Sequence, residues 1–153
     1  MKKLFVLLLA AGYCLAGIAA EPTSSWIKTT SGKINMKSIS FGVSNARIVQ
    51  ENGKVMKLPI AELNSYSVNG KLFDKMPLYK FGRPTGEMAF MEFLGKRGEL
   101  NFYRYESFNF ESIKPHDTVT NYALYNGDKL HLAVTDETLE NVCKYFGLQL
   151  TYK

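Results

Sequence analysis

The carboxyl group of Glu92 is the side chain whose type and position best fit acid–base chemistry. It should share a strand face with Phe90 and Leu94, and a carboxyl group among apolar neighbours tends toward a raised pKa and could act as a general acid. The same carboxylate could instead pair with Arg104 on a partner strand, or lie where the sheet meets solvent. The sequence places no second carboxylate opposite Glu92, so a glycosidase pair finds no support and we favour a structural role.

The two histidines offer a second acid–base candidate. His116 and Asp117 are neighbours in an irregular segment, but adjacent residues seldom orient each other as a catalytic dyad, so we interpret them as loop residues. His131 alternates with Leu130 and Leu132 and should point away from the face that these leucines share. Because metal-ligand spacings, a Gly-x-Ser-x-Gly elbow and a phosphate-binding glycine loop are all missing, the sequence predicts no metal site and no cofactor.

Aromatic side chains in irregular segments are the candidates for ligand binding. Residues 76–86 and 107–121 have no helical or strand period, and irregular segments of that length are more often functional than average. Their rings could form a sugar-stacking platform or a protein-binding patch, although rings of this kind are also common in cores. The candidate binding residues are Tyr79, Phe81, Phe108, Phe110 and His116.

The first twenty residues have the composition of an export signal. Lys2 and Lys3 precede an apolar core over residues 5–11, and small residues follow that could present a cleavage site. The apolar run is too short to cross a hydrocarbon core of ~30 Å as a permanent helix. We therefore predict cleavage after Ala20, which leaves one domain, residues 21–153, in the periplasm or outside the cell.

Cleavage would also change the charge and the cysteine count. The loss of Lys2 and Lys3 takes the net charge from +5 to +3, and without a Lys/Arg tract we expect no nucleic-acid partner. Cys14 leaves with the leader, and the Tyr13 before it does not fit a lipoprotein signal, which needs a small residue there. The remaining Cys143 has no internal disulfide partner. After cleavage, the chain contains no apolar run long enough for a transmembrane segment.

Turn signals divide the rest of the chain into β-hairpins. Three Asn-Gly pairs predict tight turns, because both residues tolerate the positive φ that primed hairpin turns require. The first should join residues 47–50 to 55–58, and the second should place Tyr66 opposite Phe73. For the third, hydrophobic matching favours Leu124 opposite Leu130 across a three-residue loop.

Three further elements complete the predicted fold. Residues 95–98 should join a strand over 88–94 to one over 100–105, with the register left open, and Pro59 should begin a single helical turn. Thr135 or Asp136 caps a helix that ends at Gly147. Its apolar stripe is formed by Leu139, Val142, Cys143 and Phe146, and this stripe should lie on the sheet. Cys143 should therefore be a buried and unreactive core residue.

Several of these segments resemble a pattern in small, uncharacterised exported bacterial proteins, many of them from the Bacteroides group. The resemblance starts in residues 52–71, a charged hairpin, a proline-led turn and a strand that ends in Asn-Gly. It continues through residues 90–94, 100–105 and 125–130 and the terminal helix. It implies export and a β-rich fold, and it supplies no catalytic residue or ligand.

The sequence therefore predicts an α+β, β-rich domain. Its antiparallel sheet of hairpins could close in part into a roll or barrel, with the C-terminal helix packed on it. We expect an exported, non-enzymatic envelope or secreted module that binds a protein or a glycan. One alternative is an envelope hydrolase that uses Glu92 or the pair His116 and Asp117. Another is a structural subunit that assembles by strand-edge pairing, and the oligomeric state stays open.

Overall fold

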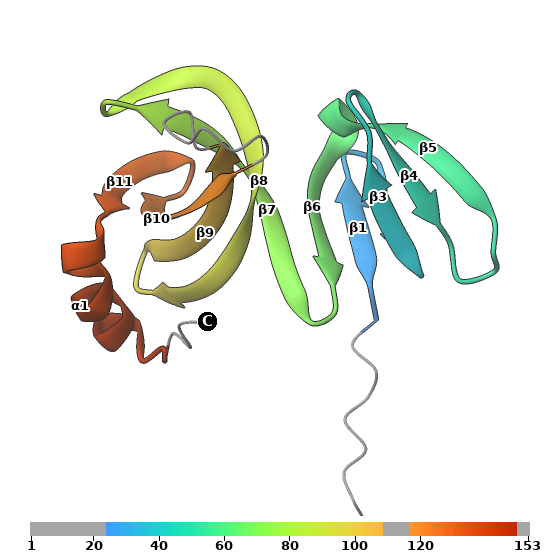
Figure 1. The fold of residues 1–153 in the computed structure, drawn as a ribbon. Helices are drawn as coiled ribbons and strands as arrows, with labels where there is room; N and C mark the ends of the chain where they lie inside the picture. Colours follow the sequence, from blue (N-terminus) through green and yellow to red (C-terminus); the bar gives the residue numbers. More distant parts are fainter. Residues whose placement is uncertain (1–23, 109–116, 150–153) are drawn as a thin grey trace, which may run out of the picture.

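The fold is an open β-sheet with a second, smaller sheet and one C-terminal helix (Figure 1). The computed structural model describes residues 24–108 and 117–149, so the predicted leader, Phe110 and His116 lie outside the described residues. The eight strands of the main sheet are, in chain order, β1 (Trp26–Thr29), β2 (Gly32–Asn35), β6 (Leu63–Val68), β7 (Lys71–Lys80), β8 (Arg83–Arg97), β9 (Leu100–Phe108), β10 (Thr118–Asn126) and β11 (Lys129–Val134). The smaller sheet contains β3 (Ser38–Phe41), β4 (Asn45–Val49) and β5 (Val55–Pro59).

The strand order confirms the predicted β-rich α+β fold and corrects one of its options. The main sheet runs β11-β10-β9-β8-β7-β6-β1-β2, and every neighbouring pair is antiparallel. Among the described residues, β11 and β2 are edge strands that do not pair with each other, so the sheet does not close into a barrel. A 3₁₀ turn, η1 (Ile60–Glu62), follows Pro59 as predicted and leads from the smaller sheet into β6.

The second Asn-Gly turn has the predicted register, and the first joins the predicted strands. Asn69 and Gly70 both have positive φ, 52° and 75°, and they place Tyr66 opposite Phe73. The first hairpin joins β4 to β5 around Gly53. Local turn chemistry was therefore sufficient to set the second pairing, whereas the first hairpin turns through five residues, 50–54, in which Gly53 has a positive φ and Asn52 does not.

The predicted register of the third hairpin is wrong. Asn126 pairs with Lys129 across a two-residue turn, and Gly127 supplies the positive φ of 60°. A bulge next to Leu124 then shifts the pairing, so that Leu124 lies opposite Leu132 rather than Leu130. One extra residue in a strand changes the register of everything beyond it, and uniform hydrophobic matching cannot detect this.

Residues 76–86, predicted to be an irregular loop, form the turn end of the long hairpin of β7 and β8. β7 and β8 pair through Lys80 and Arg83 around a turn at Phe81 and Gly82. β6 pairs with β7 only as far as Asp74, so the later part of β7 is an edge on that side. An edge tolerates proline because its N–H needs no sheet partner, which accounts for Pro77 within the strand. The segment 107–121 is also partly strand, since Phe108 pairs with Thr118.

β8 contacts different neighbours along its length. Pairing between β8 and β9 begins at Glu92 and Arg104, passes a bulge at Leu94, and ends in the predicted hairpin with Arg97 opposite Leu100. The earlier half of β8 pairs with β7 alone and arches away from β9 (Figure 1). The two strands therefore form a fork that opens at Glu92.

Two different elements cover one face of the main sheet. The smaller sheet packs against β1, β6 and β7 through a cluster around Ile27, Ile48 and Tyr66. Helix α1 (Asp136–Phe146) packs against β9 and β10 through Leu139 and Cys143. Its N-cap is Thr135 and its left-handed C-cap is Gly147, as predicted, and both Val142 and Phe146 of the expected stripe also face the sheet.

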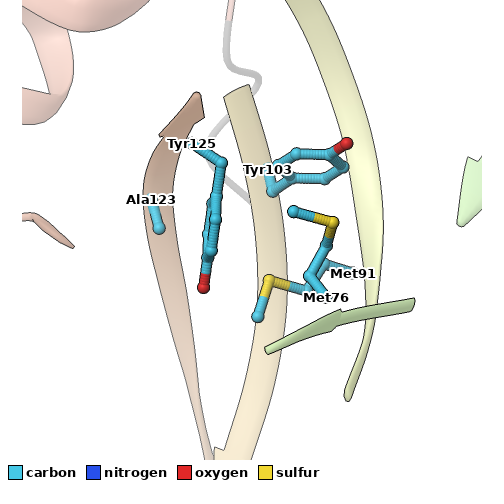
Figure 2. Packing of buried hydrophobic residues seen from close by; sticks show 5 residues of the cluster. All are labelled: Met76, Met91, Tyr103, Ala123 and Tyr125. Atoms are coloured by element: carbon cyan, nitrogen blue, oxygen red, sulfur yellow. The ribbon is translucent and has the colours of Figure 1, made fainter. Parts of the chain in front are cut away.

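The opposite face of the sheet carries its own core cluster (Figure 2). Side chains from four consecutive strands meet there, and the buried ones are Met76, Met91, Tyr103, Ala123 and Tyr125. The hydroxyl of Tyr125 donates to the carbonyl oxygen of Pro77 at 2.8 Å, so the polar edge of this buried ring has a partner.

Candidate functional site

The candidate site is a charged cluster on the same face as the smaller sheet and the helix, on the strands between the two. Glu92 lies directly opposite Phe73 on one side and Arg104 on the other, and residues paired in this way point to the same face. Lys71 lies two residues before Phe73 and so shares that face as well. The cluster therefore draws its three charged side chains from three adjacent strands.

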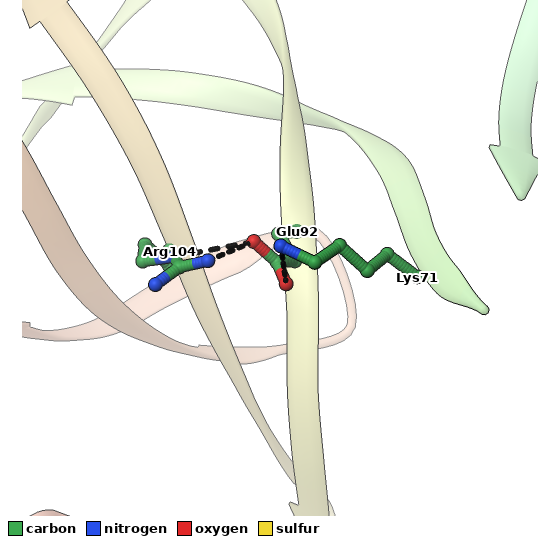
Figure 3. Close-up of polar contacts among 3 residues, drawn as sticks. All are labelled: Lys71, Glu92 and Arg104. Atoms are coloured by element: carbon green, nitrogen blue, oxygen red, sulfur yellow. Dashed lines mark hydrogen bonds and ion pairs between the residues drawn. The ribbon is translucent and has the colours of Figure 1, made fainter. Parts of the chain in front are cut away.

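Glu92 lies between its two cationic neighbours (Figure 3). The Arg104 Nε donates to Glu92 Oε2 at 3.1 Å, and Arg104 Nη2 contacts the same oxygen. The Lys71 Nζ lies 3.3 Å from Glu92 Oε1. The Glu92 side chain is 14% exposed, that of Arg104 34% and that of Lys71 53%. Both carboxylate oxygens are thus held by cations, and the pairing with Arg104 that the sequence offered as one option is present.

Charge and burial change the pKa of two groups in the cluster. The hydrogen bond to Glu92 is the main cause that raises the pKa of Arg104, so the guanidinium stays charged. Burial, followed by the nearby charge of Glu92, raises the pKa of the Tyr66 hydroxyl to about 12. Tyr66 therefore presents a neutral hydroxyl over the range of physiological pH.

A hollow of about 410 Å³ lies beside the cluster. Tyr66 and Phe73 form an aromatic wall, with ring centroids 4.7 Å apart and planes only 8° from parallel, and Phe90 meets Tyr66 edge-on at 5.2 Å. Eight residues line the hollow, of which half are aromatic and half charged: Tyr66, Lys71, Phe73, Phe90, Glu92, Arg104, Tyr105 and Glu106. Its volume falls in the range of ~300–1,000 Å³ typical of small-molecule sites.

The predicted aromatic binding residues do not come together at this hollow. Tyr79 packs in the core cluster on the opposite face, edge-on to Tyr125 at 6.2 Å. Phe81 lies at the tip of the β7–β8 hairpin with 94% of its surface exposed, and Phe108 ends β9 with 64% exposed. Only the carboxylate candidate, Glu92, belongs to the cluster.

A second polar pair, which sequence reasoning missed, lies on the opposite face and consists of Asp74 and Tyr103. The Tyr103 hydroxyl donates to Asp74 Oδ2 at 3.0 Å. Burial is the main cause that raises the pKa of Asp74, opposed by this hydrogen bond and by the charge of Lys28. The two residues come from strands that are not consecutive in the chain, so only the full sheet register could have found the pair.

The remaining chemical candidates are placed apart from one another. Cys143 is 6% exposed in the helix core cluster, and burial raises the pKa of its thiol, which confirms the predicted core position. His131 is exposed on β11, as predicted. Over the described ranges, no three acidic, histidine or cysteine side chains gather as a metal site would require. In the same part of the chain, no helix is long and apolar enough to cross a bilayer.

Comparison with protein families, with curated proteins and with solved structures found no match for this chain. The resemblance to exported proteins of the Bacteroides group stays a prediction from the sequence.

Proposed function

We propose that the protein is an exported, non-enzymatic module that binds a short glycan segment in the hollow beside Glu92. The observation that carries this proposal is the composition of the hollow, with an aromatic wall on one side and a charged rim on the other. Sugars have apolar C–H faces that pack on aromatic rings, and hydroxyls that both donate and accept hydrogen bonds. The predicted export signal supports the setting in which an envelope or secreted protein would meet a glycan.

The rim supplies both kinds of hydrogen-bonding group. Arg104 has five N–H donors and uses two of its nitrogens on Glu92, and the Lys71 side chain is more than half exposed. The carboxylate of Glu106, an exposed residue, adds acceptor oxygens at the same hollow. In this proposal Glu92 acts as a positioning residue, because it fixes the two cations in place for the ligand.

The position of Glu92 favours binding over hydrolysis. A general acid must direct a carboxyl oxygen at the scissile bond, and both oxygens of Glu92 are directed at cations of the protein. The other proposed hydrolytic pair cannot be assembled from the described residues, since His116 lies outside them.

The test is a binding screen on the purified product of the full chain, expressed with its leader. The product is applied to an array of bacterial and host oligosaccharides, and each positive is measured by calorimetry. Lys71→Met removes one exposed ammonium from the hollow, and Lys96→Met makes the same change on the exposed Lys96 near the β8–β9 turn. We expect Lys71→Met to weaken binding about tenfold or more, the value of one charge-assisted hydrogen bond, and Lys96→Met to leave it unchanged.

Two results would contradict the proposal. One is a product that retains no oligosaccharide on the array. The other is binding that Lys71→Met and Lys96→Met change equally, which would place the ligand elsewhere on the protein.

A further inference from the structure

Several exposed apolar side chains of the described residues lie in turns and strand ends along one edge of the fold. Figure 1 shows the β7–β8 turn at the upper left of the view, the β3–β4 turn at the upper right, and the end of β9 beneath the arch of β8. Five of the large apolar residues exposed in the described chain lie in or next to these segments: Phe41, Val43, Phe81, Met88 and Phe108. Single exposed apolar residues are ordinary, so the case for an interaction surface depends on the surroundings of the two at turn tips, Phe81 and Val43.

Phe81 is the most informative member of this group. It has a φ of 51°, a left-handed conformation that is a genuine outlier for a bulky residue. The corresponding position of the β6–β7 turn is Asn69, a residue that tolerates this conformation. The ring is 94% exposed, and the Nζ of Lys80 lies 5.6 Å from its centroid. Neither turn geometry nor core packing accounts for a phenylalanine here, and such conflicts concentrate at functional positions.

A second apolar tip lies on the smaller sheet. Val43 is fully exposed in the β3–β4 turn. Two backbone hydrogen bonds hold that turn, from Gly42 N to Asn45 O at 2.8 Å and from Ile60 N to Ser44 O at 3.0 Å. Both apolar tips are thus presented by ordered backbone.

Cationic side chains lie behind both tips. Lys80 and Arg83 flank Phe81, and the acidic side chain nearest in the hairpin is Glu87. Behind Val43, a hollow of about 330 Å³ is lined by Arg47 and Lys57 together with polar residues of the turn. Apolar tips with cations set behind them match the depth profile of an anionic bilayer, whose charged headgroups lie outside the acyl region.

We propose that this edge of the fold docks on the surface of an anionic phospholipid bilayer by inserting Phe81 and Val43. The tips belong to separate hairpins on separate sheets, and a fluid lipid surface accommodates separated protrusions without a shape-matched partner. Lys80, Arg83, Arg47 and Lys57 then meet the phosphate groups. This peripheral contact is independent of the proposed glycan site, which has other residues.

The test is co-sedimentation of the purified product with vesicles of phosphatidylethanolamine and phosphatidylglycerol, compared with vesicles of phosphatidylcholine. Phe81→Asn is the informative variant, because asparagine suits the left-handed turn and the hairpin should stay folded. Its matched control is Val55→Asn, which removes a 46% exposed apolar side chain from β5, away from both tips.

We expect binding to the anionic vesicles to fall about tenfold or more in Phe81→Asn, as the loss of one buried aromatic ring requires, and to stay unchanged in Val55→Asn. Lys80→Gln with Arg83→Gln should lower binding about fivefold per charge, and added salt should weaken the binding of the unmodified protein. The proposal is overturned if the unmodified protein does not sediment with anionic vesicles, or if Phe81→Asn binds as well as the unmodified protein. Phe81-dependent capture of a protein partner without vesicle binding would assign this edge of the fold to protein recognition instead.

Discussion

Replacing Arg104 with methionine should destabilise the protein far more than the same replacement at Lys71. Arg104→Met keeps an apolar stem in place and removes the guanidinium, so Glu92, 14% exposed, loses the partner that contacts it through two nitrogens. Lys71→Met removes a cation that is 53% exposed and contacts Glu92 through one atom. The two variants therefore separate a half-buried ion pair from an exposed one on the same carboxylate.

The expected sizes follow from burial. Breaking a fully buried ion pair costs ~3–5 kcal/mol, and exposed pairs contribute ~0.2–1 kcal/mol. Because Arg104 is 34% exposed, we expect its replacement to cost about 2 kcal/mol, between those two limits. The corresponding fall in melting temperature is about 6–10 °C for a domain of this size. Lys71→Met should cost about 0.5 kcal/mol or less.

Urea unfolding followed by tryptophan fluorescence and circular dichroism measures these differences. Glu92→Gln and the double variant with Arg104→Met complete a thermodynamic cycle, in which the double variant should cost less than the sum of the single ones. Equal effects of Arg104→Met and Lys71→Met, or strict additivity in the cycle, would refute the assignment of Glu92 and Arg104 as a coupled, half-buried pair.

Four further outcomes are expected. Phe81→Asn should raise the unfolding free energy by about 1 kcal/mol, since it relieves a left-handed conformation, and a lower melting temperature by scanning calorimetry would contradict the strain. Asp74→Asn should stabilise the protein at pH 7. Because the pKa of Asp74 is raised above its ordinary value of 3.8, the unmodified protein loses stability as pH rises through the folded-state pKa. The advantage of the variant, measured as a difference in urea midpoints, should therefore shrink toward acid pH. A difference that does not change with pH would contradict this expectation. Cys143 should react with a thiol reagent only after unfolding, and rapid labelling of the native protein would place it at the surface. The intact mass of the exported product should correspond to a chain that begins at Glu21, and a lipid-modified product would contradict the predicted leader.

Features set by neighbouring residues could be predicted from the sequence. The turn at Asn69 and Gly70 fixed the pairing of Tyr66 with Phe73, because positive φ at two adjacent positions leaves few alternatives. The helix limits followed in the same way from Thr135 and Gly147. The pairing of Glu92 with Arg104 could be offered as an option, since one hairpin connects their strands.

Features set by bulges and by strand neighbours could not be predicted. The bulges at Leu94 and beside Leu124 displace the register without a clear signal in the apolar pattern. The β7–β8 turn was missed because Phe81 occupies a position where Asn or Gly would be expected. Lys71 could not be assigned to Glu92, because that contact depends on the register between β7 and β8.

The fork between β8 and β9 determines how a mechanical load on the β7–β8 turn passes into the rest of the main sheet. Backbone pairing of these strands starts at Glu92 and Arg104, and the bulge at Leu94 follows almost at once. Within the backbone ladder, a load on the β7–β8 tip therefore reaches β9 first at this pair of residues, where an ion pair reinforces the ladder. The bulge keeps the ladder from sliding along the strands, because any shift would have to move the extra residue as well. The ion pair thus reinforces the first residue pair of the ladder against separation of β8 from β9.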